Sequence, residues 1–338
     1  MTYSNPYYNA DFGDFFILLF SRFWLFLQGK LGLQDLASDE IQILVLCGVA
    51  ASSALVGTFL ILKRMTMLAN SLSHTVLLGI VMAYLITRST VTEADSHAQY
   101  SGALDMHAML IAALLMGLIT VYLTEFLTKK ARLQEDASTG IVFTSLFALG
   151  LVALTLLTRN AHIGTEVVMG NVDALHVDDC QLVFGILCIN VVLLVLFFKE
   201  FTLSTFDPLL CKALGISTMF FNYLLMTQVS ATVIGAFRAV GVLMVLAFIT
   251  GPALSARLLT HSLKKMLALG VFLGCLASAI GVALSRHLLS VYDTPLSTGG
   301  LVVCTIVLLY IAVAIAAPQQ GLIARQVHRR GKIQRPEF

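Results

Sequence analysis

Long apolar stretches separated by short polar ones run through most of the chain. Each has roughly 20 residues, the length that a helix needs to cross a hydrocarbon core of about 30 Å. Strict strand-type alternation is nowhere sustained, so the pattern predicts helices rather than a barrel. We expect spanning helices near residues 41–62, 66–87, 108–127, 137–158, 180–198, 218–236, 239–258, 266–285 and 300–317.

Two segments leave alternatives open. Residues 15–28 form an ambiguous first segment, which contains Arg22 and either spans the membrane or does not. The run from 218 to 258 is long enough for two spans, but its glycines and Pro252 could instead break it into half-helices. We therefore predict an all-α membrane bundle of about eight or nine transmembrane helices. The chain is expected to form a single transmembrane domain over residues 1–338, with its membrane core at about 41–317 and a basic tail at 318–338.

Composition agrees with a membrane protein and excludes an ordinary soluble domain. Hydrophobic residues make up 58% of the chain and charged residues 12%, and the mean hydropathy is +0.89. Soluble domains carry roughly 25% charged residues. The first residues are uncharged up to Asp11, so a cleaved signal peptide is not expected and the spans themselves would direct insertion.

The distribution of Lys and Arg predicts the orientation. Fifteen of these residues lie in one set of alternate connections and in the tail, whereas three, Arg88, Arg159 and Arg286, lie in the opposite set. Because short cytoplasmic loops are enriched in positive charge, the first set and the C-terminus are expected in the cytoplasm. The basic tail is explained as an anchor against anionic lipid, and no nucleic-acid partner is expected.

The predicted outer loops are acidic and contain several histidines, which suits either ordinary solvated loops or contacts with divalent cations. None of these residues shows a diagnostic ligand spacing. The six cysteines form no Cys-x-x-Cys pair and read as small packing residues. The residues of the outer loops are Glu93, Asp95, His97, Asp105, His107, His162, Glu166, Asp173, His176, Asp178, Asp179 and Asp293.

Polar side chains within a spanning segment are costly in lipid and therefore indicate function. Asn70 and His74 lie four residues apart in the segment 66–87, so that an amide oxygen and an imidazole nitrogen share one helix face. They could contribute two ligands to a metal ion. Alternatively, with Ser73 and Gly79, they could form a hydrogen-bonded face that packs against another helix.

A second polar island, residues 206–215, lies in a predicted cytoplasmic connection. Asp207 is suited to be an N-cap, Pro208 to the first helical position and Gly215 to a helix stop. The sequence therefore predicts a two-turn helix outside the bilayer. It could dock into a groove of a partner protein or merely connect two spans.

Four stretches together resemble the permease subunits of ATP-binding-cassette (ABC) importers for manganese, zinc or iron. They occur in the family's order and are KRMTMLANSLSHTVLLG (residues 63–79), QEDASTGIVFTSLFALG (134–150), FDPLLCKALGIS (206–217) and FRAVGVLMVLAFITGPALSARLL (237–259). The resemblance extends with intervals from about residue 41 to about 315. Residues 15–28 and the basic tail are not covered by it.

The resemblance implies a metal site at Asn70 and His74. Family members typically read Gly-Asp-Ala-x-Ser-His-x-x-x-Pro-Gly here, so His74 and Gly79 match, whereas Asn70 replaces the Asp and Leu78 replaces the Pro. An amide in place of the carboxylate weakens the charge of the site. Other spans must then add ligands, or passage relies on weak binding. The absent Pro implies a straighter helix.

The resemblance also implies that residues 206–215 are the coupling helix that seats in a cleft of the ATP-hydrolysing subunit. Gly241 and Pro252 match elements that suggest a broken or closely packed helix along the translocation path. The residues that match the coupling motif are Phe206, Asp207, Pro208, Leu209, Leu210, Ala213, Leu214 and Gly215.

The expected function is import of a divalent transition metal, manganese, zinc or iron, by alternating access. The chain contains no Gly-x-x-x-x-Gly-Lys-[Ser/Thr] loop, so it is not expected to be an enzyme, and ATP would act through a partner subunit. No permanent cofactor is expected. The expected partners are the ATPase, an extracytoplasmic metal-binding protein, a second permease copy or a related permease, and the lipid of a prokaryotic inner membrane.

A stand-alone secondary transporter is the alternative function. An intramembrane protease is disfavoured because His-Glu-x-x-His is absent.

Overall fold

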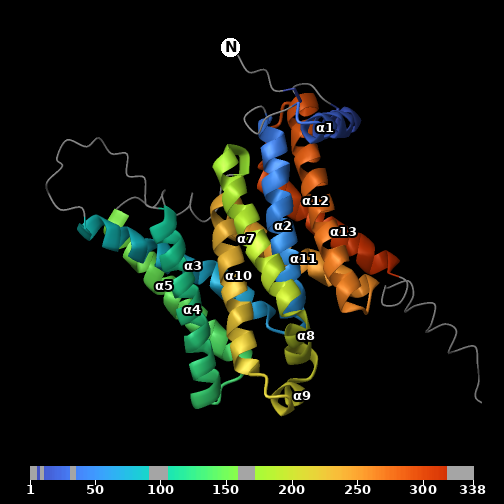
Figure 1. The fold of residues 1–338 in the computed structure, drawn as a ribbon. Coiled ribbons are helices and arrows are strands. Elements are labelled where there is room, and N and C mark those ends of the chain that lie inside the picture. Colours follow the sequence, from blue (N-terminus) through green and yellow to red (C-terminus); the bar gives the residue numbers. More distant parts are fainter. Residues whose placement is uncertain (1–5, 8–10, 31–35, 91–105, 159–171, 318–338) are drawn as a thin grey trace, which may run out of the picture. The chain divides into compact units, whose positions relative to one another are not determined.

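The computed structural model describes the chain except for residues 1–5, 8–10, 31–35, 91–105, 159–171 and 318–338, and in this part it contains helices and turns but no strand (Figure 1). The elements are α1 Phe12–Leu27, α2 Ser38–Leu62, α3 Thr66–Thr90, α4 Met106–Lys130, α5 Glu135–Thr158, the 3-10 turn η2 Val172–Ala174, α7 Val177–Leu196, α8 Phe198–Phe206, α9 Pro208–Ala213, α10 Thr218–Val240, α11 Val242–Leu259, α12 Leu263–Tyr292 and α13 Thr298–Ala316.

The predicted all-α membrane fold is confirmed. Each predicted span coincides with a helix: α2, α3, α4, α5, α7, α10, α11, α12 and α13, in chain order. In the described part, six of these helices are long and apolar enough to cross a membrane, namely α2, α5, α7, α10, α12 and α13, and α11 is a shorter apolar helix.

The long run from 218 to 258 forms two helices that are separated at a single residue. Gly241 ends α10 with a φ of 76°, in the left-handed region where a residue without a Cβ is favoured, and α11 begins at the next residue. The ambiguous segment 15–28 corresponds to α1, which ends one residue earlier, at Leu27. Its 16 residues rise only about 24 Å, short of the hydrocarbon thickness.

The helices form two compact units. The first comprises residues 1–61, 171–191 and 243–338, and thus α1, α2, η2, most of α7, and α11 to α13. Of the 18-residue apolar stretch in each helix, 78% is buried in α2 but only 17% in α13. Helix α13 therefore presents most of its surface to the surroundings. A Cβ on Gly57 of α2 would lie 2.1 Å from the Ile249 carbonyl oxygen of α11, which shows how closely these two helices pack.

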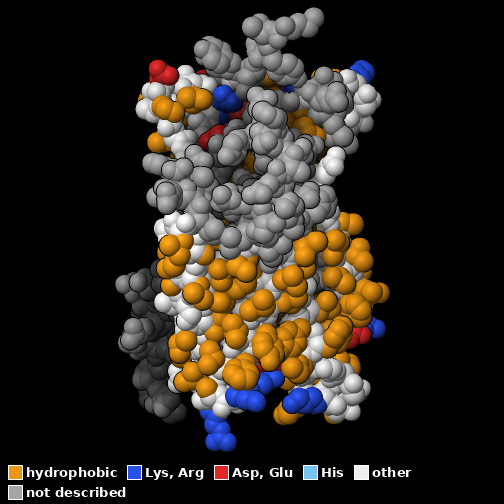
Figure 2. Space-filling view, turned by 90° about the vertical axis from the view of Figure 1, so that its left-hand side faces the viewer, with side chains coloured by type: hydrophobic (Ala, Val, Ile, Leu, Met, Phe, Trp, Pro, Cys, Tyr) orange, Lys and Arg blue, Asp and Glu red, His pale blue; other side chains and the backbone are white. Residues whose placement is uncertain are grey.

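The second unit comprises residues 62–170 and 192–242, with α3, α4, α5, α8, α9 and α10. Here α3 packs against α4 and α5, and α10 packs against α4 and α3. One side of α4 exposes an apolar stripe with spacings of three and four residues, as a lipid-facing helix does. Figure 2 views the side on which α3, α4 and α5 lie in Figure 1 and shows hydrophobic side chains over much of the described surface, with Lys and Arg at the lower edge. The stripe consists of Ile111, Leu115, Ile119, Tyr122 and Phe126.

Candidate functional site

His74 lies on α3 against an aromatic wall supplied by α5. Its imidazole is half-buried, and its ring centroid lies 5.2 Å from that of Phe143 and 5.3 Å from that of Phe147. The two phenylalanines are stacked on each other, with centroids 5.9 Å apart. Packing against these two large rings restricts the orientation of the imidazole, as the ligand of a defined site requires.

Asn70 lies one turn before His74 and is also half-buried. No hydrogen bond joins either side chain to another residue in the part of the chain that the structure describes. Ser73, between them, donates to the Ala69 carbonyl of its own helix at 2.9 Å. Among the described residues, Asn70 and His74 therefore do not form the hydrogen-bonded packing face that the sequence left open, and their polar atoms have no hydrogen-bond partner there.

The hydroxyl contact between α3 and α4 involves other residues. Thr75 and Thr120 have hydroxyl oxygens 3.0 Å apart, and both side chains are fully buried. The buried hydroxyl of Ser71 has no hydrogen-bond partner among the described residues. Within the same described set, no group of three or more His, Cys, Asp or Glu residues could hold a metal ion. His74 and Asn70 thus offer two donors rather than a complete coordination shell.

The helix-break residues lie where helices meet or end. Gly79 is buried on α3. Pro252 lies inside α11 without ending it, and a Cβ on Gly274 of α12 would meet its ring at 3.5 Å. Beside Pro252, a Cβ on Gly251 would lie 2.3 Å from Ile306 of α13. The first unit is therefore closely packed around Pro252.

The island at 206–215 forms the predicted short helix, α9. Its N-cap is Asp207, whose Oδ1 accepts the Leu210 backbone N–H at 2.9 Å, and Pro208 is the first helical residue. Gly215, with a φ of 74°, allows the chain to turn back, and the Ile216 N–H closes the end by donating to the Cys211 carbonyl at 3.0 Å. Local sequence signals thus determine both ends of α9.

The surface of α9 is apolar and open. Leu209 is 79% exposed and Leu214 is 59% exposed, whereas Cys211 is fully buried and anchors the helix. Exposed leucines on a capped helix outside the spanning segments form a surface suited to a hydrophobic groove on a partner protein. The full set of exposed apolar residues here is Phe206, Leu209, Leu210 and Leu214.

Lys63, a half-buried lysine counted in the sequence only as a charge that sets the orientation, connects the elements beside α9. The Nζ of Lys63 donates to Ser204 of α8 at 3.1 Å and to the Asn222 side-chain oxygen of α10. Burial lowers the pKa of Lys63 to about 8. In the sequence, Lys63 follows an apolar run directly and precedes another basic residue. Nothing in that position indicates a contact with α8 and α10.

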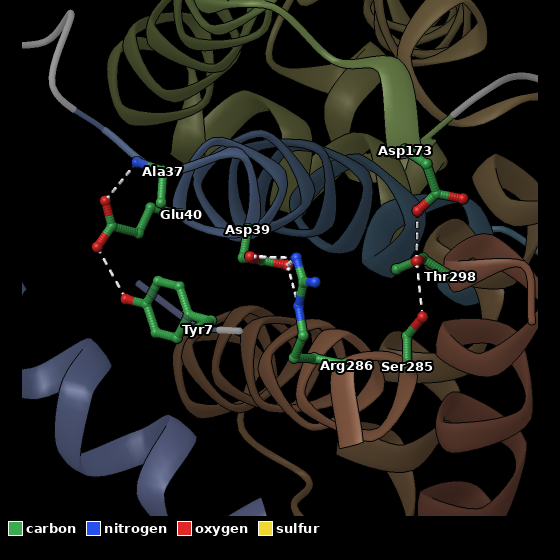
Figure 3. A network of polar contacts seen from close by, with 8 residues as sticks. All are labelled: Tyr7, Ala37, Asp39, Glu40, Asp173, Ser285, Arg286 and Thr298. Atoms are coloured by element: carbon green, nitrogen blue, oxygen red, sulfur yellow. Dashed lines mark hydrogen bonds and ion pairs between the residues drawn. The ribbon is translucent and has the colours of Figure 1, made fainter. Parts of the chain in front are cut away.

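A polar network at the end of the first unit where α2 begins was also not anticipated (Figure 3). Asp39 accepts hydrogen bonds from Arg286 of α12, with Nε–Oδ1 at 3.0 Å and Nη2–Oδ2 at 2.5 Å. Thr298 donates to Asp173 at 2.5 Å and lies 2.9 Å from Ser285. These groups line a cavity of about 320 Å³. Arg286, counted in the sequence as an outer-loop charge, is therefore a structural partner of Asp39.

The acidic outer loops are only partly described. Asp173 is engaged by Thr298, and Asp179 accepts the His176 backbone N–H at 3.0 Å, as a helix cap does. Glu93, Asp95, His97, Asp105, His162 and Glu166 lie outside the described residues, as does the basic tail.

Comparison with known proteins gives a consistent result. Residues 41–317 match the ABC 3 transport family. A probable metal transport system membrane protein of Chlamydia trachomatis is 40% identical over 95% of this chain and 97% of its own length. The manganese transport system membrane protein MntD of Bacillus subtilis is 35% identical over 82% of this chain and 92% of its own length. Among solved structures, PsaBC from Streptococcus pneumoniae in complex with Fab has a TM-score of 0.71 and 24% identity, and covers 87% of this chain and 97% of that one.

Proposed function

Since the chain belongs to the ABC 3 transport family, and is thus an integral membrane permease of metal importers, we propose that it moves manganese into the cytoplasm, driven by a separate ATP-hydrolysing subunit. The two helical units form one permease domain in a prokaryotic inner membrane, with the C-terminus in the cytoplasm. The permease acts as a dimer of two copies or with a related permease. An extracytoplasmic metal-binding protein delivers the cation.

The exposed, capped helix α9 is the observation that supports this proposal most strongly. A secondary transporter, driven by an ion gradient, has no use for an apolar docking helix on its cytoplasmic side. In an ABC importer, this surface receives the ATPase, and dimerisation of the ATPase switches the permease between outward-open and inward-open states. Leu209 and Leu214 provide the apolar contact, and Asp207 holds the helix in shape.

In the permease, the cation passes His74 and Asn70 on α3. A neutral imidazole and an amide oxygen suit borderline divalent ions such as Mn²⁺, Zn²⁺ and Fe²⁺. The manganese system of the Bacillus relative supports Mn²⁺ as the first ion to test. Only two donors come from this helix, so we expect weak, transient binding that favours passage over retention.

The metal path is tested by uptake of radioactive manganese into proteoliposomes that contain the permease with its ATPase and its binding protein. His74→Ala should lower uptake at least about tenfold, a loss that even supporting residues of metal sites commonly cause. His261→Ala, the same change at an exposed histidine between α11 and α12, should leave uptake unchanged. If His74→Ala preserved uptake of manganese, zinc and ferrous iron alike, the site assignment would be wrong.

The docking role of α9 is tested separately by co-purification with the ATPase subunit. Leu209→Asp should abolish association, because it places a charge in the centre of the apolar surface, and should leave folding intact, because the side chain is exposed. Val291→Asp, an equally drastic change at an exposed position in the last turn of α12, is the matched control. Normal association of the Leu209 variant would contradict the docking role of α9, whereas gradient-driven uptake by the chain alone would support a secondary transporter.

A further inference from the structure

Helix α1 lies outside the residues that match the family, and its side chains divide into three sides. Successive residues on a helix are about 100° apart, so positions seven apart fall on one side. Asp14, Ser21 and the C-cap residue Gln28, at spacings of seven, are polar and exposed. A second side carries Phe15, which is fully buried, and Arg22, which is half-buried.

The third side is apolar and exposed. Ile17, Phe20 and Trp24, at spacings of three and four residues, are 69%, 72% and 57% exposed. Leaving such side chains in water is costly, at about 25 cal/mol for each Å² of apolar surface. This side of α1 therefore requires an apolar environment.

Residues of the second side bind α1 to the end of the first unit at which α2 begins. Arg22 forms an ion pair with Glu40, the Nε–Oε1 distance being 2.5 Å. Glu40 is itself buried and also accepts the Tyr7 hydroxyl at 2.8 Å and the Ala37 backbone N–H at 2.8 Å (Figure 3). The ring of Phe12 approaches His287 of α12, with centroids 6.4 Å apart. These contacts fix which sides of α1 face outward.

Within the first unit, α1 lies crosswise to α2 and α12 (Figure 1). A cavity of about 500 Å³ opens between α1 and α2, and is lined mainly by apolar side chains such as Phe16, Phe20 and Phe23 of α1 and Ile43 and Leu44 of α2. A short crosswise helix beside the end of a spanning helix, with polar, protein-facing and aromatic sides, has the features of a helix that lies in the membrane interface.

We propose that α1 is an interfacial lipid-binding helix. Its side of Ile17, Phe20 and Trp24 enters the acyl chains at the end of the bundle where α2 begins, and an acyl chain occupies the cavity beneath it. The polar side faces water. Bilayer lipid is the occupant because α2 and α12, against whose ends α1 packs, are both long and apolar enough to cross a membrane, so that α1 lies where such a membrane would end. Aromatic rings are also typical of the membrane interface.

Trp24 is the sole tryptophan of the chain, so the tryptophan fluorescence of the unmodified protein, excited selectively over its tyrosines, reports on α1 alone. The full chain is placed in bilayers of phosphatidylcholine brominated either near the carboxyl end or near the methyl end of the acyl chains. We expect quenching by both lipids, stronger with bromine near the carboxyl end, and little quenching by aqueous iodide. Strong iodide quenching with little lipid quenching would mean that α1 faces water or a protein. Stronger quenching from the methyl end would mean that α1 inserts deeply.

Two variants provide a matched test. Phe20→Glu places a carboxylate on the proposed lipid side, and should lower lipid quenching of Trp24 at least about twofold and shift its emission to the red. Ser21→Glu places the same group on the proposed water side and should leave the lipid quenching unchanged. Both variants retain Arg22 and Glu40, and thermal unfolding of both reports whether they fold. Equal responses of the two variants would overturn the proposal. Manganese uptake is measured separately, so failure of this proposal and failure of the transport function are distinguishable.

Discussion

At the scale of single residues, Asn70 places an amide one turn before His74, where members of the family typically have a carboxylate. Asn70→Asp adds a negative charge to a site that otherwise offers two neutral donors. We expect Mn²⁺ to bind about tenfold more tightly, corresponding to ~1.4 kcal/mol, and to be released more slowly. Calorimetric titration in nanodiscs measures the affinity, and Asn70→Ala should weaken it. An unchanged affinity in both variants would place Asn70 outside the contact shell of the ion.

Lys63 predicts a pH dependence of stability. Burial lowers its pKa in the folded protein from 10.5 to about 8, so between these values the unfolded chain binds more protons than the folded one. The free energy of unfolding should therefore rise with pH across this window, as the linkage relation requires. Thermal unfolding in nanodiscs at several pH values measures it. Other groups also titrate here, so the comparison is with Lys63→Met, whose stability should rise less steeply over the same window.

At the scale of elements, α9 depends on its N-cap. Asp207→Ala removes the side-chain oxygen that accepts the Leu210 N–H and should destabilise the helix by about 1 kcal/mol, whereas Asp207→Asn retains an acceptor and should cost much less. Hydrogen exchange of the backbone amides in residues 208–213 measures the loss. ATPase stimulation by the permease should fall in the same order. Equal exchange in both variants would show that packing of Cys211, not the cap, maintains α9.

The crossing of α2 and α11 depends on Gly57. A Cβ there would lie 2.1 Å from a backbone oxygen of α11, which no side-chain rotation relieves, so Gly57→Ala should destabilise the protein by about 1–3 kcal/mol. Gly185 of α7 has no atom within 4 Å of the corresponding point, which makes Gly185→Ala the control. Unfolding temperatures of the two variants in the same detergent compare them. A stable Gly57 variant would mean that α2 and α11 can separate without cost.

These examples show which features a sequence can predict. The spans follow from hydrophobic runs of sufficient length, and α9 follows from Asp207, Pro208 and Gly215, because both depend on neighbouring residues. Pairings between distant helices do not follow in the same way. Asp39 and Arg286 are 247 positions apart, and nothing local to either one indicates the other. The aromatic wall that α5 places beside His74 was missed for the same reason, since Phe143 and Phe147 look like any lipid-facing residues.

At the scale of the whole molecule, the membrane topology links the distribution of basic residues, the separation of α10 from α11 at Gly241 and the coupling role of α9. Lys212 precedes α10 and Thr294 follows α12, so three helices, α10, α11 and α12, lie between them. If each spans, the two positions face opposite sides of the membrane, and the basic residues place Lys212 inside. If α10 and α11, which are separated only at Gly241, are instead half-helices that together cross the membrane once, both positions face the same side.

Single cysteines at these two exposed positions distinguish the two topologies. In a background without the six native cysteines, Thr294→Cys in intact cells should react with a membrane-impermeant maleimide, and Lys212→Cys should react only after permeabilisation. Reaction of both before permeabilisation, or of neither, would mean that α10 and α11 do not cross separately. The reverse labelling pattern would instead place α9 outside the cell, where no ATP-hydrolysing subunit can reach it. The coupling role of α9 therefore depends directly on the result, because a docking helix on the wrong side of the membrane cannot transmit ATP hydrolysis to α3.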